Sequence, residues 1–177
     1  MSGRSTRSDA VVDGLADWGI EVFVHVPSSH VAPIIQGLEE GGVQSVLANR
    51  EEEGVGIAGG LALAGRRVAM VIQDNGFGNA LTALTTFAKA YHVGLPIVAN
   101  TRGGLGEYNA MIHSFSEAVP DLLRAAGIRA ERLGPSQSPA LWRRTTTAVA
   151  ELAVMTHRPV ALLLDVMHPA TAEDLAA

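Results

Sequence analysis

The chain has 177 residues, of which 47% are hydrophobic, and a formal net charge of −5 at neutral pH. It contains no cysteine, which excludes disulfides, thiolate catalysis and cysteine-ligated metals. The net negative charge without a basic patch argues against nucleic acid or an anionic membrane as a partner. We expect one domain over residues 1–177, without a membrane span or a secretory signal, and therefore a cytoplasmic protein.

Apolar runs of strand length alternate with amphipathic stretches along the chain, which predicts strands and helices in turn. In chain order we expect a helix at 5–18, a strand at 21–26, a helix at 30–40, a strand at 43–48, a Glu-rich helix ending near 64, a strand at 67–73, a helix at 80–91 and a strand at 95–100. A long polar loop at 101–114 is followed by helices at 116–126 and 139–157 and a strand at 160–166. Ser5 or Thr6 is expected to cap the first helix, and Gly19 to end it.

This alternation predicts an α/β sandwich around a mostly parallel sheet. In such sheets, ligands bind beyond the carboxyl ends of the strands. The segments expected at that edge are 27–30, 49–53, 73–79, 100–113 and 165–168. Together they form the predicted site.

Three consecutive carboxylates, Glu51, Glu52 and Glu53, stand where a predicted strand gives way to a helix of small residues. The positive end of a helix dipole stabilises a carboxylate in the first turn. A carboxylate buried beside small apolar residues is either paired or functional. Glu51 shares the better apolar face, with Val55 and Ala58, although helical spacing alone does not decide among the three. The alternative is that all three are solvated.

The same helix contains a glycine pattern typical of dinucleotide-binding loops. Gly54, Gly56 and Gly59 spell G-x-G-x-x-G, and Asp74 lies near the distance expected of a ribose-binding acid. In that fingerprint the glycines follow the strand directly, whereas residues 49–53 intervene here. We therefore expect the glycines to lie inside a closely packed helix, and we keep a nucleotide-binding module as an alternative.

Four segments together carry a family resemblance. They are REEEGVGIAGG (50–60), QDNGFGN (73–79), LPIVANTRGGLGE (95–107) and RPVALLLDV (158–166). In order and approximate spacing they resemble the pyrimidine-binding domain of thiamine-diphosphate-dependent decarboxylases, sulfopyruvate decarboxylase alpha subunits most of all, with phosphonopyruvate decarboxylases next. The resemblance covers nearly the whole chain and implies a three-layer α/β sandwich with a six-stranded sheet.

The resemblance assigns roles around the cofactor, thiamine diphosphate. It places Glu51 at the catalytic position, where a glutamate contacts the N1′ atom of the aminopyrimidine. It also implies that the turn after the third strand lines the pyrimidine pocket, although Asp74 and Phe77 depart from the Asn and Leu typical there. The implied cofactor-binding residues are Glu51, Gln73, Asn75, Gly76, Phe77, Gly78 and Asn79. The alternative for this turn is an ordinary connection, with Asn79 as a helix N-cap.

Two histidines fall in segments where related decarboxylases place groups that shuttle protons. His30 and His113 are accordingly candidates for protonating the intermediate after carbon dioxide leaves, since imidazole titrates near neutral pH. Each is alternatively a surface or capping residue. Ser28 and Ser29 either donate hydrogen bonds to the substrate or cap the helix that follows.

An anionic 3-substituent on the substrate requires a cation. Guanidinium suits a sulfonate or a phosphonate geometrically, and Arg102 is the better candidate, with Arg50 second. Either arginine is alternatively part of a surface ion pair. The resemblance implies 3-sulfopyruvate or 3-phosphonopyruvate as the substrate, decarboxylated to sulfoacetaldehyde or phosphonoacetaldehyde, and the sequence does not choose between them.

One motif of this enzyme class is missing. Such enzymes bind the cofactor's diphosphate through Mg²⁺ with a Gly-Asp-Gly motif, which does not occur in this sequence. The resemblance therefore implies a separate beta subunit that carries the diphosphate and Mg²⁺ site. The chain would be the alpha subunit of a hetero-oligomer and inactive alone. A non-catalytic relative of the same fold is the remaining alternative.

Overall fold

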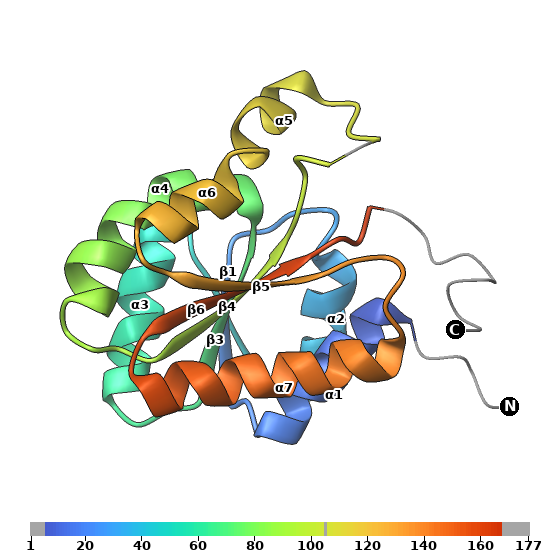
Figure 1. Ribbon diagram of the computed structural model, residues 1–177. Coiled ribbons are helices and arrows are strands. Elements are labelled where there is room, and N and C mark those ends of the chain that lie inside the picture. The colour runs from blue at the N-terminus through green and yellow to red at the C-terminus, as the bar shows by residue number, and fades with distance from the viewer. Residues whose placement is uncertain (1–5, 105, 168–177) are drawn as a thin grey trace, which may run out of the picture.

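The computed structural model describes residues 6–104 and 106–167, which fold into three layers with a parallel sheet between two layers of helices (Figure 1). The described residues form six strands in the spatial order β2-β1-β3-β4-β6-β5, and every neighbouring pair is parallel. The strands are β1 (Val22–His25), β2 (Gln44–Leu47), β3 (Val68–Gln73), β4 (Leu95–Asn100), β5 (Arg129–Leu133) and β6 (Pro159–Leu164). The predicted α/β class and parallel sheet are confirmed.

The helices divide between the two faces of the sheet. One face packs against α1 (Arg7–Trp18), α2 (Ala32–Glu40) and α7 (Pro139–Thr156), and the other against α3 (Glu51–Leu63), α4 (Phe77–Ala83) and α6 (Val119–Ala125). Two irregular turns flank α4, the 3₁₀ turn η1 (Asp74–Gly76) and the π-helical turn η2 (Leu84–Lys89). The short helix α5 (Ala110–Ser116) stands away from the sheet beyond the strand ends.

Two hydrophobic cores hold these layers together, one on each side of the sheet. The inner strands β4 and β6 are buried along their whole length, which explains why their sequences are continuous apolar runs. Burial of each large side chain, such as Leu95 or Ile97, contributes about 1.5–3 kcal/mol. Within the described ranges, no helix is long and apolar enough to cross a membrane.

The first helix begins and ends as its sequence predicts. The Thr6 hydroxyl accepts the N–H of Asp9, and the Asp9 carboxylate accepts the N–H of Thr6, which together form a capping box. Gly19 ends the helix with φ of 81°, a left-handed conformation that favours glycine. Ser5, the alternative cap, and His168, at the end of the predicted site segments, lie outside the described residues.

Two expectations for the second half of the chain were wrong. Strand β5 is not among the strands expected from the sequence, because its sequence, Arg-Ala-Glu-Arg-Leu, is polar, as suits the exposed edge of the sheet. The loop expected at 101–114 contains most of α5, which begins after Asn109, whose side chain accepts the N–H of Met111. The helix expected at 116–126 is accordingly shorter and starts at Val119.

Candidate functional site

Polar side chains gather where the central strands end. Strands β1, β3 and β4 lie side by side, and Gln73 and Asn100 end β3 and β4 as direct neighbours. The segments 27–31, 74–79 and 101–109 continue from these three strands, and the N-terminus of α3 lies beside the second of them through the contact of Glu51 with Asn79. The fold therefore brings together 27–30, 49–53, 73–79 and the first part of 100–113, four of the five segments that the sequence predicts to form a site.

Glu51 is the first residue of α3, and its side chain faces the turn that follows β3. The residue is 8% exposed. The Nδ2 atom of Asn79 donates a hydrogen bond of 2.8 Å to its Oε2 atom. The carboxylate also lies directly against Gly76, where a Cβ atom would come within 2.5 Å of Oε1. A buried carboxylate is therefore held in one orientation, with its Oε1 atom against a residue that has no side chain.

The other two glutamates of this turn have different partners. Glu52 forms an exposed ion pair with Arg50, at 2.6 Å between Nε and Oε1. Glu53 accepts the backbone N–H of Asn49 at 2.8 Å and is exposed. Arg50, the second candidate for binding an anion, is thus engaged at the surface, and of the three carboxylates only Glu51 is directed to the turn after β3.

The turn from Gln73 to Asn79 is built from close contacts. The ring of Phe77 is 1% exposed and belongs to the hydrophobic core beneath the turn. Gly78 lies against the ring of Phe115 from α5, which a Cβ atom would meet at 2.9 Å. Asn79 lies inside α4, whose N-cap is Gly76, so the alternative that Asn79 caps this helix was wrong.

A second polar cluster lies over the ends of β1, β3 and β4. The Ser28 hydroxyl donates to Oε1 of Gln73 at 3.0 Å, and Nε2 of Gln73 donates to Oδ1 of Asn75 at 2.8 Å. The Nη1 atom of Arg102 lies 3.2 Å from Nδ1 of His30 and 3.5 Å from Oε1 of Gln73. Ser28, His30, Gln73 and Arg102 therefore form one connected group.

Arg102 forms a buried ion pair with Glu107, a residue that the sequence analysis did not single out. Two hydrogen bonds join the side chains, Nε to Oε2 at 2.5 Å and Nη2 to Oε1 at 2.9 Å. Both side chains are at most 5% exposed. The hydrogen bonds from Arg102 lower the pKa of Glu107 to about 2. The sequence carries no clear signal for this pair, because an acid five residues after an arginine in a glycine-rich loop has no fixed position relative to it.

Asp74, which is 1% exposed, links the turn after β3 to two later segments. Its Oδ2 atom accepts the backbone N–H of Arg102 at 2.8 Å, and its Oδ1 atom accepts the hydroxyl of Ser116 at 2.7 Å. Burial raises the pKa of Asp74, although these hydrogen bonds oppose the shift. An aspartate directly after an apolar strand was the sequence signal for this position.

The remaining predicted residues lie at the margin of the cluster. Ser29 is exposed, with its hydroxyl 3.3 Å from Nδ1 of His30. Because Val31 is the N-cap of α2 and no side chain caps that helix, the alternative that Ser28 or Ser29 caps it was wrong. His113 lies on α5, outside the sheet, and its Nδ1 atom is 3.8 Å from Glu117.

The glycines of the G-x-G-x-x-G pattern lie inside α3, as predicted. Gly54 packs against Met70, and Gly59 against the ring of Phe87. These contacts serve helix packing. The tight turn directly after a strand, which a dinucleotide-binding loop requires, is not formed by these residues.

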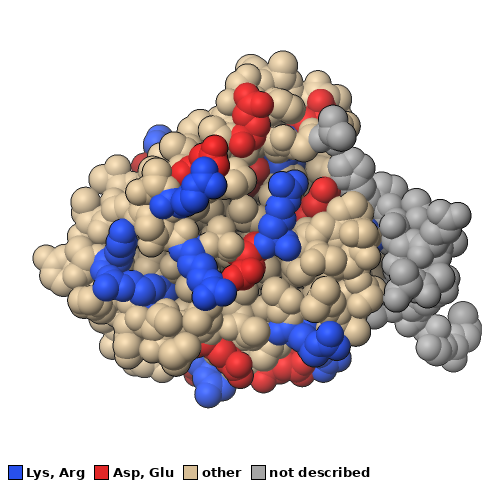
Figure 2. Space-filling model, in the orientation of Figure 1, with Lys and Arg blue, Asp and Glu red and all other residues tan. Residues whose placement is uncertain are grey.

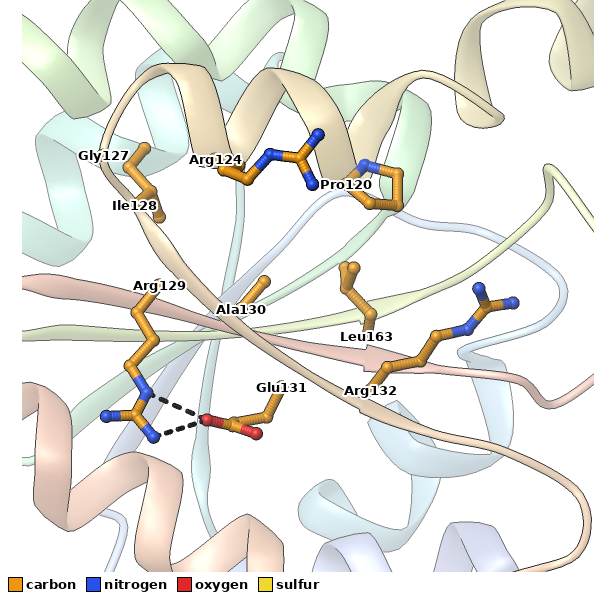
Figure 3. A pocket seen from close by; sticks show the side chains of 9 residues that line it. All are labelled: Pro120, Arg124, Gly127, Ile128, Arg129, Ala130, Glu131, Arg132 and Leu163. Carbon is orange, nitrogen blue, oxygen red and sulfur yellow. Dashed lines mark hydrogen bonds and ion pairs between the residues drawn. The ribbon is translucent and has the colours of Figure 1, made fainter.

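A hollow of about 530 Å³ lies away from the strand ends, between α6 and the edge strand β5 (Figure 3). Pro120, Ile128 and Leu163 are among its apolar lining residues. Of its arginines, Arg124 is paired with Asp121 and Arg129 with Glu131. Figure 2 shows basic and acidic side chains interspersed over the visible face. This hollow does not include any of the residues predicted to form the site.

Comparisons with known proteins show which family this chain resembles. Residues 5–104 match the family described as "Thiamine pyrophosphate enzyme, N-terminal TPP binding domain". The sulfopyruvate decarboxylase subunit alpha of Methanothermobacter thermautotrophicus is 30% identical over 91% of this chain and 96% of its own length. Its counterpart from Methanococcus maripaludis is 28% identical over 91% and 95%.

A solved structure supports the fold alone. The chain superposes on the 2-oxoglutarate:ferredoxin oxidoreductase from Magnetococcus marinus with a TM-score of 0.64 and 18% identity. The match covers 91% of this chain and 29% of that chain. The parallel sandwich thus occurs as part of a longer polypeptide in that protein.

Proposed function

Because the chain belongs to the thiamine pyrophosphate enzyme family, as its N-terminal TPP-binding domain, we propose that it is the alpha subunit of a thiamine-diphosphate-dependent 2-oxo acid decarboxylase. The substrate we propose first is 3-sulfopyruvate, which yields sulfoacetaldehyde and carbon dioxide, and 3-phosphonopyruvate is second. The single observation that carries the proposal is the buried Glu51 carboxylate, held by Asn79 against Gly76.

The residues of this site fit an aminopyrimidine ring. Such a ring needs a carboxylate that can share a proton with a ring nitrogen, and Glu51 retains lone pairs beyond the one that Asn79 occupies. Gly76 offers backbone with no side chain beside that carboxylate. Bound thiamine diphosphate would supply the electron sink that decarboxylation needs, so the protein has only to bind, to orient and to hold protons.

Each cofactor-binding residue has a task consistent with its contacts. Glu51, the proposed catalytic residue, would share a proton with a ring nitrogen of the bound cofactor, and Asn79 fixes the orientation of its carboxylate. Gln73 and Asn75, which are hydrogen-bonded to each other, provide polar groups at the rim of the turn. Phe77 and Gly78 contribute only backbone atoms to the proposed cofactor site, since the Phe77 ring is in the core and Gly78 packs against Phe115.

The second cluster is proposed to bind the substrate. His30 and Ser28 offer a ring nitrogen and a hydroxyl near Gln73, and Ser29 lies at the exposed rim. Arg102 contributes a positive charge close to His30 and Gln73 for the anionic group, although its Nε and Nη2 atoms donate to Glu107 and its Nη1 atom is directed to His30. His113, on α5, is the second candidate for protonating the intermediate.

A separate partner subunit completes the proposed enzyme. The two methanogen relatives are each named subunit alpha, and this sequence has no Gly-Asp-Gly motif for the diphosphate and Mg²⁺. We therefore propose a hetero-oligomer, in which a beta subunit binds both of these groups. The chain alone is expected to be inactive.

The experiment that tests this proposal measures release of carbon dioxide. The tagged chain is purified from its own host together with any bound partner and assayed with each 2-oxo acid, with and without thiamine diphosphate and Mg²⁺. Cofactor-dependent release by the complex, absent from the chain alone, is the expected result. Robust turnover by the chain alone would contradict the split enzyme.

The same preparation distinguishes the two alternatives. A complex that forms but releases no carbon dioxide from any 2-oxo acid would favour a non-catalytic relative of the same fold. Binding of ATP or NAD(H) without binding of thiamine diphosphate would favour a nucleotide-binding module. The helical position of Gly54 and Gly59 disfavours this second outcome.

A further inference from the structure

The contacts of His30 define which of its ring nitrogens carries a proton. Its Nδ1 atom lies 3.2 Å from Nη1 of Arg102 and 3.3 Å from the hydroxyl of Ser29. A guanidinium has only hydrogen-bond donors and keeps its proton throughout the accessible pH range. Nδ1 must therefore act as an acceptor in this contact. In the neutral ring, the proton is then on Nε2.

Glu107 fixes the guanidinium that imposes this choice. Its two oxygens accept Nε and Nη2 of Arg102 in a bidentate arrangement, at 2.5 and 2.9 Å. The backbone N–H of Asn109 also donates to Oε1 of Glu107, at 2.8 Å, and so restrains the carboxylate. A planar guanidinium held along one edge has little rotational freedom, and the Nη1 atom is directed towards His30 and Gln73.

We propose that Glu107 is a positioning residue which, through Arg102, holds His30 as the neutral tautomer with its proton on Nε2. The Nε2–H group is then available as a neutral donor to an oxygen of the substrate. The tautomer is a property of this chain, and only its chemical use rests on the proposed decarboxylase. A merely structural ion pair would anchor the loop at 101–109 without selecting a tautomer at His30.

The electrostatic surroundings of His30 also favour its neutral ring. Burial and the positive charge of Arg102 lower its pKa, whereas Glu107 raises it. Among the described residues, Arg102 and Glu107 are the charged groups that shift the pKa of His30, and both come from the loop after β4. Ser29, on the histidine's own segment, contributes a neutral hydroxyl. At neutral pH the ring is thus expected to be uncharged, as the contact with Arg102 requires.

The test is an NMR measurement on the full chain, labelled with ¹⁵N-histidine, alone and bound to its partner. His30 is assigned from the signal that His30→Gln removes. We expect an unprotonated Nδ1, a protonated Nε2 and a pKa below the ordinary histidine value of 6.5. If the unmodified chain shows a mixture of both tautomers, or a protonated Nδ1, the proposal is overturned and no variant is needed.

Variants then test the role of Glu107. Glu107→Gln weakens the bidentate arrangement and is expected to let both tautomers of His30 populate, whereas Ser29→Ala should leave the Nε2–H tautomer dominant. If Glu107→Gln does not fold, Arg102→Met combined with Glu107→Gln removes both charges from the buried site and should give the same mixture. An unchanged single tautomer in either variant would refute a positioning role.

The NMR test of the Glu107 role and the decarboxylation test of the proposed function can fail independently of each other. Absence of decarboxylation together with the expected ¹⁵N spectrum would remove the decarboxylase and keep the role of Glu107. Decarboxylation together with mixed tautomers in the unmodified chain would keep the decarboxylase and remove that role.

Discussion

Gly76 packs so closely against the carboxylate of Glu51 that there is no room for a side chain at position 76. A Cβ atom at Gly76 would come within 2.5 Å of Oε1 and 2.7 Å of the carboxyl carbon of Glu51. The contact joins the turn after β3 to the N-terminus of α3, two segments that are 25 residues apart in the sequence. The position of the carboxylate therefore depends on a glycine in another element.

Gly76→Ala is expected to displace the Glu51 carboxylate and to lower decarboxylation at least tenfold, because small misplacements of reacting groups are costly. The measurement is release of carbon dioxide by the complex with its partner. The matched control is Gly60→Ala, since a Cβ atom at Gly60 meets nothing within 4 Å. Full activity of Gly76→Ala would show that the carboxylate position is not critical.

Glu51→Gln is expected to lower decarboxylation by roughly 10²–10⁴-fold, the range typical of losing a general acid or base. The fold should persist, since the amide oxygen of glutamine can still accept the hydrogen bond from Asn79. Partner binding and the melting temperature are measured beside activity. Glu53→Gln, at an exposed carboxylate of the same helical turn, is the control and should remain active. Equal losses in both variants would indicate an effect of helix charge instead of a role specific to Glu51.

Asp74→Asn is expected to stabilise the protein increasingly as the pH rises. Burial raises the pKa of Asp74 above its ordinary 3.8, so the folded state favours the protonated form. The contribution of this group to stability is therefore most favourable below pH 3.8 and declines as the pH rises through the folded-state pKa. Asparagine does not titrate and can still accept the N–H of Arg102.

Melting temperatures of both proteins from pH 3 to pH 8 test this expectation. The difference between Asp74→Asn and the unmodified chain should increase as the pH rises from 3.8 through the folded-state pKa of Asp74 and then level off. Asp74→Ala serves as the comparison, because it leaves the N–H of Arg102 and the hydroxyl of Ser116 without their acceptor, at a cost of about 1–3 kcal/mol. A difference that does not change with pH would mean that Asp74 is not perturbed.

The fold was largely predictable because its inner strands are buried on both faces. Their continuous apolar runs, in β3, β4 and β6, are unambiguous in the sequence. The edge strand β5 was not predictable from pattern, since a polar strand at an exposed edge resembles a loop. Helix α5 was missed because it has only seven residues, too few for a clear helical period.

The sequence predicted which segments form the candidate site, but it did not predict which side chains within them contact one another. Helical spacing favoured Glu51 without excluding Glu52 and Glu53, and only the tertiary contacts with Gly76 and Asn79 separate it from them. The partnership of Arg102 with Glu107 could not be inferred from the sequence. It depends on how the loop after β4 folds back, and residues five apart in a loop have no fixed geometry.

Lowering the pH should remove the gain in folding stability that the Glu107 carboxylate gives over a glutamine at the same position. The pKa of Glu107 is lowered from its ordinary 4.5 to about 2 by the hydrogen bonds from Arg102. A lowered pKa contributes stability that is fully present above the unfolded-state value and is lost as the pH falls towards the folded-state value. The unmodified chain should therefore exceed Glu107→Gln in stability at pH 6, and the difference should shrink between about pH 4.5 and pH 2.

Urea unfolding midpoints across that range give the measurement, with Glu131→Gln as the control, since the exposed pair of Glu131 with Arg129 contributes little. A difference that persists unchanged at pH 2 would show that Glu107 acts through its shape and not through its charge.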